Sequence, residues 1–291
     1  MSTARQRRPT MADVAERAGV SRTLVSFILD GKPGASDETR QRVLAIAEEI
    51  GYRPDSAARL LAQGRSRTLG VMIDVRQLFQ AEMVTSIHPA AERLGYEVLL
   101  SANLPDRTEG AVVESLLSHR CGALLLLGPY AAQSDLMRMA ERVPVVVACR
   151  RLPGLTDDVP LATVRTNDTK GIRQAIDYLA SLGHRRIHHV DGGSDPGSAD
   201  RSRAYRSAMR AHGLAAETAV IAGAHNEEAG AAAAHTMLAA SELPTAVLAG
   251  NDRCALGILD LFTRSGISVP EHASLVGYDD NRISENPRID L

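Results

Sequence analysis

The sequence predicts a small all-α head followed by a two-lobed α/β core of doubly wound parallel sheets. Two observations support this prediction: short helical patterns fill residues 1–52, and short apolar runs alternate with helical stretches from residue 69 to the end. A third is the length, because 291 residues are too many for one small core and suit two or three modules. We therefore divide the chain into a head (1–52), a connecting segment (53–68) and a core (69–291), whose lobes span about 69–160 and 161–291.

Composition argues against several classes of protein. No apolar run reaches the length of a membrane span, and the start, "MSTARQRRPT", lacks the apolar middle of a signal peptide. We therefore expect a cytoplasmic protein with no membrane partner. The three cysteines, Cys121, Cys149 and Cys254, are far apart and follow no CxxC pattern, so buried thiols are expected rather than a metal site. We predict no cofactor.

Charge is unevenly distributed along the chain. Residues 1–68 contain twelve Lys and Arg against eight Asp and Glu, whereas the remainder contains 21 against 27. The net charge of −2 therefore combines a cationic head with an anionic body. This distribution predicts that the head alone approaches a polyanion.

Capping signals place two short helices at the start. Thr10 and Asp13 have the spacing of a capping box, so a helix is expected to begin at Met11. Gly19 can adopt a left-handed conformation and end that helix. Ser21 then caps a second helix.

The second helix is amphipathic. Val25, Ile28 and Leu29 form its buried face. Two helices joined by a short turn containing Gly make a helix-turn-helix, and the outward face of the second helix can enter a major groove. The alternative to a DNA-binding helix-turn-helix is an ordinary helical hairpin that belongs to a larger fold. The outward face carries Arg22, Thr23, Ser26 and Phe27.

A third helix completes the head. Ser36 caps "DETRQRVLAIAEEIG", and its apolar positions Val43, Leu44, Ala47 and Ile50 are expected to close a three-helix core.

The chain resembles the lactose-repressor (LacI) family of bacterial transcription regulators. The matching segments are "DVAERAGVS", the "GK" after the second helix, "YRP", "AARLL" and several blocks downstream. The resemblance extends from Thr10 to the end of the chain. It implies that the core has the type I periplasmic-binding-protein-like fold.

The resemblance also assigns roles in the head. Arg22, Thr23 and Phe27 match positions that read base edges, where Arg can contact guanine and Thr or Phe a thymine methyl. The alternative for Phe27 is that its ring packs into the core of the head instead of contacting DNA. The hydroxyl side chains are expected to contact phosphates, which position the protein without specifying sequence; these are Thr10, Ser21 and Ser26.

The connecting segment resembles the family's hinge helix, from about residue 55 to 62. In the family this helix orders on operator DNA, pairs with its mate from the second subunit and lies in the minor groove. Leu61 matches the leucine that wedges between the central base pairs. Arg59, with Arg65 and Arg67, would supply charge to the phosphates. The alternative is a passive tether.

The core alternates strands with helices. Apolar runs at 69–74, 97–102, 122–128 and 143–149 predict buried parallel strands, with helices near 81–94, 108–119 and 133–142. The second series contains "RRIHHVDGG", "TAVLAGND" and "SLVGYDD". Ligands of such sheets bind beyond the carboxyl ends of the strands, where "VDGGSD", "AGND" and "GYDD" gather polar residues.

The resemblance places an effector site in the cleft between the lobes. It implies contacts from Arg201, Asn251 and Asp279, with acceptors and a planar donor suited to a sugar or other polar metabolite. Two alternatives stay open: Arg201 and Asp279 pair across the lobes, and Asn251 caps a helix. His184 matches a structural block, and His188 and His189 alternate along a strand, which argues against a metal site. The remaining candidate contacts are Phe79, Arg150 and His225.

This chain departs from the family at several of these positions. Cys149-Arg150 stands where relatives have Asp-Arg, His225 stands where an aromatic residue is common, and Phe79 is the one plausible stacking platform. The chain stops at "ENPRIDL", where relatives begin a further crossing, so we expect the first lobe to lack a strand and a helix, with an exposed sheet edge.

These observations predict a dimeric DNA-binding transcription regulator, most often a repressor in this family. Two heads would read a pseudo-palindromic operator in double-stranded DNA, and the lobes would sense a small-molecule effector. A sugar-binding transport protein of similar fold should have an export signal and no basic head. An enzyme is disfavoured because the chain has no G-x-S-x-G, no P-loop and no G-x-G-x-x-G after a strand.

Overall fold

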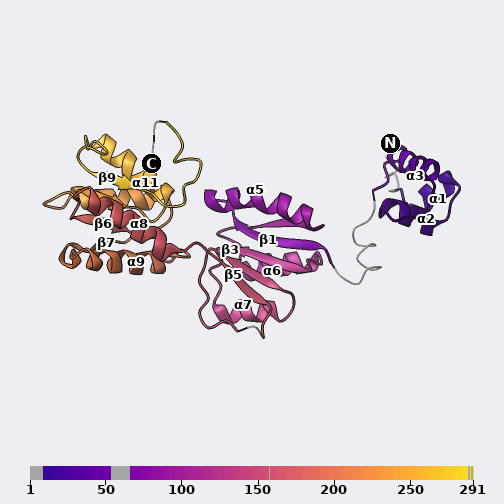
Figure 1. Ribbon diagram of the computed structural model, residues 1–291, viewed down its shortest axis with the longest axis horizontal. Coiled ribbons are helices and arrows are strands. Elements are labelled where there is room, and N and C mark those ends of the chain that lie inside the picture. Colours follow the sequence, from indigo (N-terminus) through magenta and orange to yellow (C-terminus); the bar gives the residue numbers. More distant parts are fainter. Residues whose placement is uncertain (1–8, 54–65, 157, 288, 290) are drawn as a thin grey trace. The chain divides into compact units, whose positions relative to one another are not determined.

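The computed structural model describes residues 9–53, 66–156, 158–287, 289 and 291. The chain divides into two compact units, and the boundary lies between Ser66 and Arg67. The first unit is the all-α head, and the second contains two parallel sheets with their helices (Figure 1).

The head contains three helices with the predicted caps. They are α1 (Met11–Ala18), α2 (Arg22–Leu29) and α3 (Asp37–Glu49). The Thr10 hydroxyl and the Asp13 carboxylate cap each other's backbone N–H groups, and Gly19 ends α1 in the left-handed conformation, at a φ of 65°. Ser21 and Ser36 cap α2 and α3 through their side-chain oxygens.

The three helices enclose one apolar core. Val14, Val25 and Val43 are completely buried at its centre, one from each helix. The prediction for α3 was wrong at Leu44, which is 45% exposed. Leu44 lies about 100° further round the helix than Val43, outside the stripe formed by Val43, Ile46, Ala47 and Ile50.

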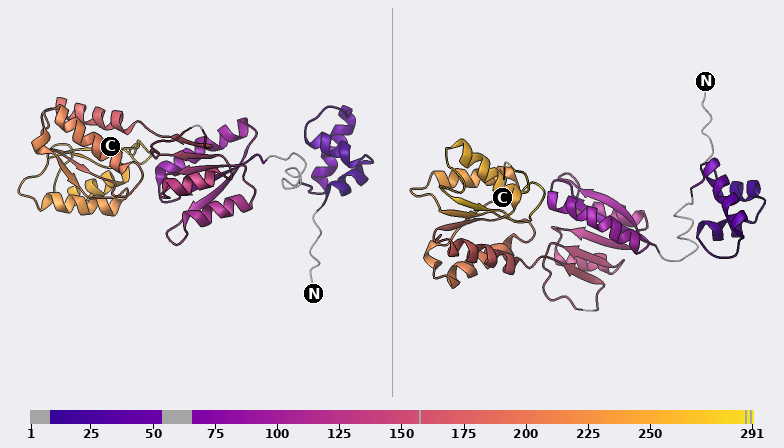
Figure 2. Two further views of the ribbon diagram at one scale, coloured as in Figure 1. Left: turned by 90° about the horizontal axis from the view of Figure 1, so that it is seen from below. Right: turned by 45° about the horizontal axis from the view of Figure 1, so that its top comes forward.

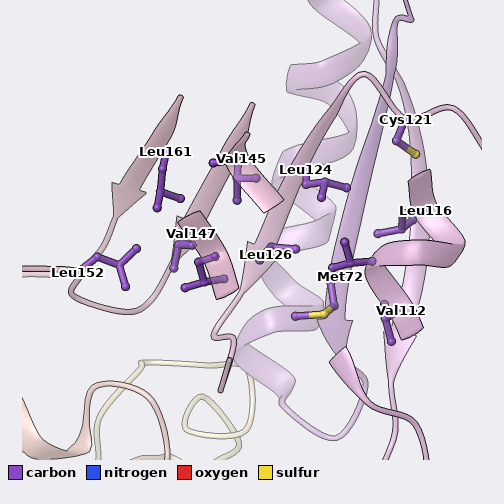
Figure 3. Close-up of a cluster of buried hydrophobic side chains, with 13 residues drawn as sticks. Met72, Val112, Leu116, Cys121, Leu124, Leu126, Val145, Val147, Leu152 and Leu161 are labelled. Atoms are coloured by element: carbon purple, nitrogen blue, oxygen red, sulfur yellow. The ribbon is translucent and has the colours of Figure 1, made fainter. Parts of the chain in front are cut away.

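The first lobe is a five-stranded parallel sheet with the order β2-β1-β3-β4-β5. Side chains alternate between its two faces, as expected for strands. One face packs on α6 and α7 through the cluster that includes Met72, Leu124 and Val147 (Figure 3). The other face packs on α5 through Val71 and Ile73. The elements are β1 (Thr68–Asp74), α5 (Leu78–Arg93), β2 (Glu97–Asn103), α6 (Glu109–Ser118), β3 (Ala123–Leu127), α7 (Gln133–Ala140), β4 (Val145–Ala148) and β5 (Leu161–Val164).

The second lobe is a four-stranded parallel sheet with the order β7-β6-β8-β9. Helices α8 and α9 pack on one face, and α10 and α11 pack on the other (Figures 1 and 2). The elements are α8 (Asp168–Ser181), β6 (Ile187–Val190), α9 (Ser198–Ala211), the short 3₁₀ helix η1 (Ala215–Glu217), β7 (Ala219–Ile221), α10 (Glu227–Leu238), β8 (Ala246–Leu248), α11 (Asp252–Arg264) and β9 (Ser274–Val276).

Two of the strands, β5 and β7, were not predicted from the sequence. β5 pairs in parallel with β4, so Leu161–Val164 belongs to the sheet of the first lobe. β7 was not predicted at all. Both are short outer strands, and neither is buried along its length: most of β5 is exposed, and the three apolar residues of β7 are only half-buried.

Helices α10 and α11 approach each other closely at two glycines. A Cβ atom on Gly257 would lie 2.0 Å from the Glu227 carbonyl oxygen, and one on Gly230 would lie 2.1 Å from the Cys254 carbonyl oxygen. Backbone atoms cannot move aside as a flexible side chain can. The close packing of this face of the second sheet therefore depends on the absence of side chains at both positions.

We expect Gly257→Ala to destabilise the core by about 1–3 kcal/mol, because the added methyl must push the two helices apart. Chemical denaturation followed by circular dichroism measures this change. Gly110→Ala is the matched control, since a Cβ at Gly110, in the first turn of α6, meets no atom within 4 Å. It should leave stability unchanged or raise it by about 0.4–1 kcal/mol. Equal effects of the two substitutions would contradict the packing argument.

Candidate functional site

The outer face of α2 is exposed to solvent. Val25 and Ile28 turn into the head core, whereas Arg22 and Thr23 lie on the opposite side. Phe27 is 41% exposed and therefore does not pack inward. The centroid of its ring lies 5.5 Å from the Lys32 ammonium nitrogen, which is close enough for a cation–π interaction. Arg22 makes no hydrogen bond or ion pair with any residue that the structure describes.

The predicted phosphate contacts lie at helix starts or on α2. The Thr10 hydroxyl donates to the Asp13 carboxylate at 2.8 Å, so its proton is already engaged. The Ser21 oxygen accepts the Leu24 N–H at 3.2 Å, and Ser26 is half-buried along α2. Arg59 and Leu61, the two predicted DNA contacts of the connecting segment, lie outside the described residues.

The core contains a cavity of about 50 Å³ beyond the carboxyl ends of its strands. Nearly every strand contributes at least one residue just after its end: β1, β3, β4 and β5 from the first lobe and all four strands of the second. The first lobe and the crossing that leaves it contribute Gln77, Phe79, Gln80, Gly128, Tyr130, Cys149 and Thr166. The second lobe contributes Asp195, Pro196, Arg201, His225, Asn251 and Asp279.

Arg201 on α9 is the central charged group. It is buried, and its guanidinium is surrounded by partners. Nε donates to the Asp168 carboxylate at 3.2 Å, one terminal nitrogen donates to the Gly250 carbonyl oxygen at 2.6 Å, and the other lies 3.5 Å from the Asp279 carboxylate. The Tyr278 ring stacks against it with 3.8 Å between the guanidinium carbon and the ring centroid. The predicted alternative in which Arg201 and Asp279 pair across the lobes is therefore wrong in one respect, because both residues belong to the second lobe.

Asp279 is held in an unfavourable conformation and environment. Its φ of 110° lies in a region that side chains other than Gly rarely adopt. Burial raises the pKa of its carboxyl to about 7, even though Arg201 beside it acts in the opposite direction. A buried carboxyl that exchanges its proton near neutral pH, at the end of a strand and in a cavity, is typical of functional sites.

Asp195 joins the two lobes across the cavity. Its carboxylate accepts the Tyr130 hydroxyl of the first lobe at 2.7 Å and the His225 backbone N–H at 2.8 Å. The His225 Nδ1 atom lies 3.5 Å from the same carboxylate. Burial and the neighbouring Arg201 lower the pKa of His225 to about 4, so its ring is neutral at physiological pH.

Two further contacts connect the lobes beside the cavity. Arg253 on α11 pairs with Glu227 and also donates to the Arg76 carbonyl oxygen of the first lobe at 2.8 Å. The Glu82 carboxylate on α5 accepts the Arg282 backbone N–H at 2.9 Å. With the Tyr130–Asp195 bond, hydrogen bonds therefore join the lobes at three places, and each contact can break without unfolding a lobe.

Arg150 does not line the cavity, although its neighbour Cys149 does. Its guanidinium donates to the carbonyl oxygens of Pro129 and Ala131, at 3.0 and 2.5 Å. These two carbonyls flank Tyr130. Arg150 thus holds the segment that carries Tyr130 and does not itself line the cavity. This finding corrects the prediction that Arg150 contacts the ligand directly.

The structure brings five of the six predicted cavity residues together. Asn251 is also the N-cap of α11, since its side-chain oxygen accepts the Cys254 N–H at 2.9 Å. Sequence reasoning missed Tyr130 and the roles of Asp168 and Asp195. Asp195 belongs to the polar segment "VDGGSD", which begins at the end of β6 and could have been used to predict it as a cavity residue. No pattern in the sequence around Tyr130 predicts that it lines the cavity. The five residues are Phe79, Arg201, His225, Asn251 and Asp279.

His189 is buried beneath the cavity on β6. Its Nδ1 atom lies 2.9 Å from the Leu248 carbonyl oxygen, and burial lowers its pKa to about 4. His184 bridges Thr245 and Ser274 through its two ring nitrogens, which agrees with a structural role. Within the described part of the chain, no group of three or more His, Cys, Asp or Glu side chains is arranged to hold a metal ion.

Comparison with known proteins identifies both parts of the chain. Residues 10–55 match the family described as bacterial regulatory proteins, lacI family, and residues 176–290 match the periplasmic binding protein-like domain. The transcriptional regulator GalR of Salmonella typhimurium is 32% identical over 284 residues, which are 96% of this chain and 82% of GalR. This chain belongs to the LacI family. It is a DNA-binding transcription regulator with a helix-turn-helix head and a two-lobed core.

Solved structures agree with this assignment. A LacI transcriptional regulator from Rhodococcus is 44% identical and has a TM-score of 0.74 over 77% of this chain and 82% of that one. The lac repressor dimer bound to operator and the anti-inducer ONPF is 27% identical, with a TM-score of 0.82 over 96% and 85% of the two chains. The relatives are regulators, so the enzyme and transport alternatives are set aside. None of the described helices is both long and apolar enough to cross a membrane.

We expect His189 to make stability fall below neutral pH. Its pKa is about 4 in the folded chain and about 6.5 when unfolded, so the unfolded state gains the proton first as pH falls. The loss begins below about pH 6.5 and approaches about 3 kcal/mol near pH 4. His225 acts in the same direction and Asp279 in the opposite one, so the test compares wild type with His189→Asn, whose amide can still donate to Leu248.

Denaturation midpoints measured between pH 4 and pH 8 give the two profiles. The variant should lose less stability than wild type as pH falls, and the difference between the profiles isolates His189. Parallel profiles would show that this imidazole does not carry the pH dependence.

Proposed function

We propose that this LacI-family regulator is a repressor that binds a pseudo-palindromic operator as a dimer and is controlled by a small-molecule effector in the interlobe cavity. The observation that supports operator reading most directly is the division of α2 into two faces. The buried face secures the helix to the head, and the opposite face presents the Arg22 guanidinium, a hydroxyl and an aromatic ring to solvent.

The residue types on that face suit base recognition. An Arg side chain can donate two parallel hydrogen bonds to guanine, and the Thr23 methyl or the Phe27 ring can contact a thymine methyl. We assign these roles to Arg22, Thr23 and Phe27. Ser21 and Ser26 are assigned to phosphates, while Thr10 has its proton engaged with Asp13 and would need to share its hydroxyl. Of the hinge segment, residues 53–68, Leu61 is proposed to wedge between base pairs from the minor groove, and Arg59 is proposed to supply charge to the phosphates.

A dimer is supported by apolar side chains left exposed on the first lobe. β2 is an outer strand of its sheet, and Leu100 on it is 42% exposed. Leu94 just before β2 is 72% exposed, and Tyr96 and Leu104 are also exposed. Apolar side chains gathered around one sheet edge are typical of protein interfaces. The lac repressor, to which this chain is similar, has been solved as a dimer on its operator.

Effector control is supported by the contacts that span the cavity. A ligand that binds between Tyr130 and Asp195 favours one arrangement of the lobes over another. It can change operator affinity only by the difference in its binding free energy for those arrangements. We assign direct ligand contact to Phe79, Arg201, His225, Asn251 and Asp279, and we assign Arg150 the positioning of Tyr130.

We expect Arg22→Ala to weaken binding to the preferred operator by about 1–3 kcal/mol and to relax preference at one base pair. Selection of bound sequences from a random pool of duplex DNA, followed by affinity titration at one salt concentration, measures both effects. Arg173→Ala, which removes one positive charge from the core surface, is the control and should change neither. Equal weakening on every sequence would make Arg22 a phosphate contact, and a wild-type protein with no sequence preference would overturn the proposed function.

We expect Leu100→Arg to weaken dimerisation by about tenfold or more, because a guanidinium would be buried without a partner in the proposed interface. Sedimentation at several concentrations should show wild type near twice its chain mass of 31.1 kDa and the variant shifted toward the monomer. Leu182→Arg, at an exposed leucine after α8, should leave the dimer intact. If both substitutions behave alike, the β2 edge is not the interface.

A further inference from the structure

Helix α2 lacks a stabilising charge at its own carboxyl end. Its first turn contains no acidic residue, which leaves the positive end of the helix dipole open to a phosphate, and its last turn contains no basic residue. With eight residues the helix is also too short to be stable alone in water. Another part of the head must therefore hold the end of α2.

Arg40 on α3 supplies the missing cation. It is half-buried and stands three residues before Val43, which is completely buried in the core of the head. Two different terminal nitrogens of its guanidinium donate hydrogen bonds, one to the Ile28 carbonyl oxygen at 3.3 Å and one to the Lys32 carbonyl oxygen at 2.7 Å. Ile28 belongs to the last turn of α2, where carbonyl groups need partners from outside the helix and a positive charge is stabilising.

The loop that follows α2 depends on the same side chain. Four consecutive residues of this loop are exposed, and two of them, Gly31 and Gly34, have left-handed φ angles of 70° and 124°. A Cβ atom at either glycine would meet no atom within 4 Å, so packing does little to fix the path of the loop. Hydrogen bonds hold it instead: the Lys32 N–H donates to the Phe27 carbonyl oxygen at 2.9 Å, and Arg40 holds the Lys32 carbonyl.

The path of this loop decides what stands beside Phe27. The Lys32 ammonium nitrogen lies 5.5 Å from the centroid of the Phe27 ring and 3.5 Å from the Asp30 carboxylate. The ring is exposed, so the cation next to it belongs to the surface that α2 presents. A shift of the Lys32 backbone would change both the shape and the charge of that surface.

We propose that Arg40 is a positioning residue for operator reading: without touching DNA, its guanidinium clamps the carbonyl oxygens of Ile28 and Lys32 and so fixes the end of α2 and the place of the Lys32 ammonium beside Phe27. This inference rests on the proposed function, in which the outer face of α2 reads base edges. It adds a residue of α3 to those that determine sequence preference.

The experiment compares the affinities of the full-length protein for its preferred operator and for a scrambled duplex of equal length, at one salt concentration. The preferred operator is the one obtained by selection from a random pool. Arg40→Ala is measured beside Arg42→Ala. Arg42 is an exposed residue of the same helix, about 200° further round it, so both variants lose one positive charge from α3 but only the first loses the clamp.

We expect Arg40→Ala to lower the ratio of the two affinities by about tenfold, because two hydrogen bonds from a charged donor are lost. Arg42→Ala should weaken both duplexes alike and leave the ratio unchanged. Arg40→Lys should give an intermediate ratio, since an ammonium keeps the charge but lacks the planar fork that reaches two carbonyls at once.

A spectroscopic measurement without DNA follows the proposed route through Lys32. The chain has three phenylalanines, so 4-fluorophenylalanine gives three fluorine resonances, and Phe27→Leu identifies the one from the head. Arg40→Ala and Arg40→Lys should shift the Phe27 resonance, whereas Arg42→Ala should not. The resonances of Phe79 and Phe262, both in the core, should stay in place in all three variants.

Equal weakening of both duplexes by Arg40→Ala would make Arg40 a phosphate contact and overturn the proposal. An unchanged Phe27 resonance in the Arg40 variants would overturn it as well. If Arg40→Ala unfolds the head, Arg40→Lys decides, because a wild-type ratio in that variant refutes the two-carbonyl clamp. A wild-type protein without sequence preference would overturn the proposed function and this inference with it, whereas a preference that survives in Arg40→Ala refutes the role of Arg40 alone.

Discussion

Arg201 is a charged side chain held almost entirely out of water, and the cost of that desolvation determines how the floor of the cavity is built. A buried guanidinium needs acceptors on every side. Here they come from the start of α8, the end of β8 and the loop after β9. One side chain on α9 therefore ties together four elements of the second lobe, and their relative positions set where Asp279 and Asn251 face the cavity.

The contacts between the lobes are of a different kind. Tyr130 with Asp195, Arg253 with the Arg76 carbonyl, and Glu82 with the Arg282 N–H are single hydrogen bonds at the lobe boundary. A hydrogen bond of this sort contributes about 1 kcal/mol net, or roughly twice that when one partner is charged. Each lobe thus has its own packed core, and hydrogen bonds of this strength join the two, so a ligand that prefers one arrangement of the lobes can favour it through its binding free energy.

Local patterns were sufficient for the head. A capping box, a left-handed Gly and two Ser caps act within three or four residues, so Thr10, Gly19, Ser21 and Ser36 could be assigned from sequence and confirmed. The central strands of the core could also be predicted from the sequence, because they are buried on both faces and are therefore apolar. β5 and β7 were not predicted; both are short outer strands whose side chains are mostly exposed or only half-buried.

The amino-acid sequence by itself determined the caps, the order of strands and helices, and the gathering of polar residues at the strand ends, because each depends on neighbours along the chain. It also marked Arg201 and Asp279 through the resemblance to a known family. Only the tertiary structure decided that Tyr130 meets Asp195 across 65 positions and that Cys149 faces the cavity while Arg150 turns to the Tyr130 segment. Such contacts depend on how separate elements pack and on which way adjacent side chains point at a strand end, and no local pattern encodes either.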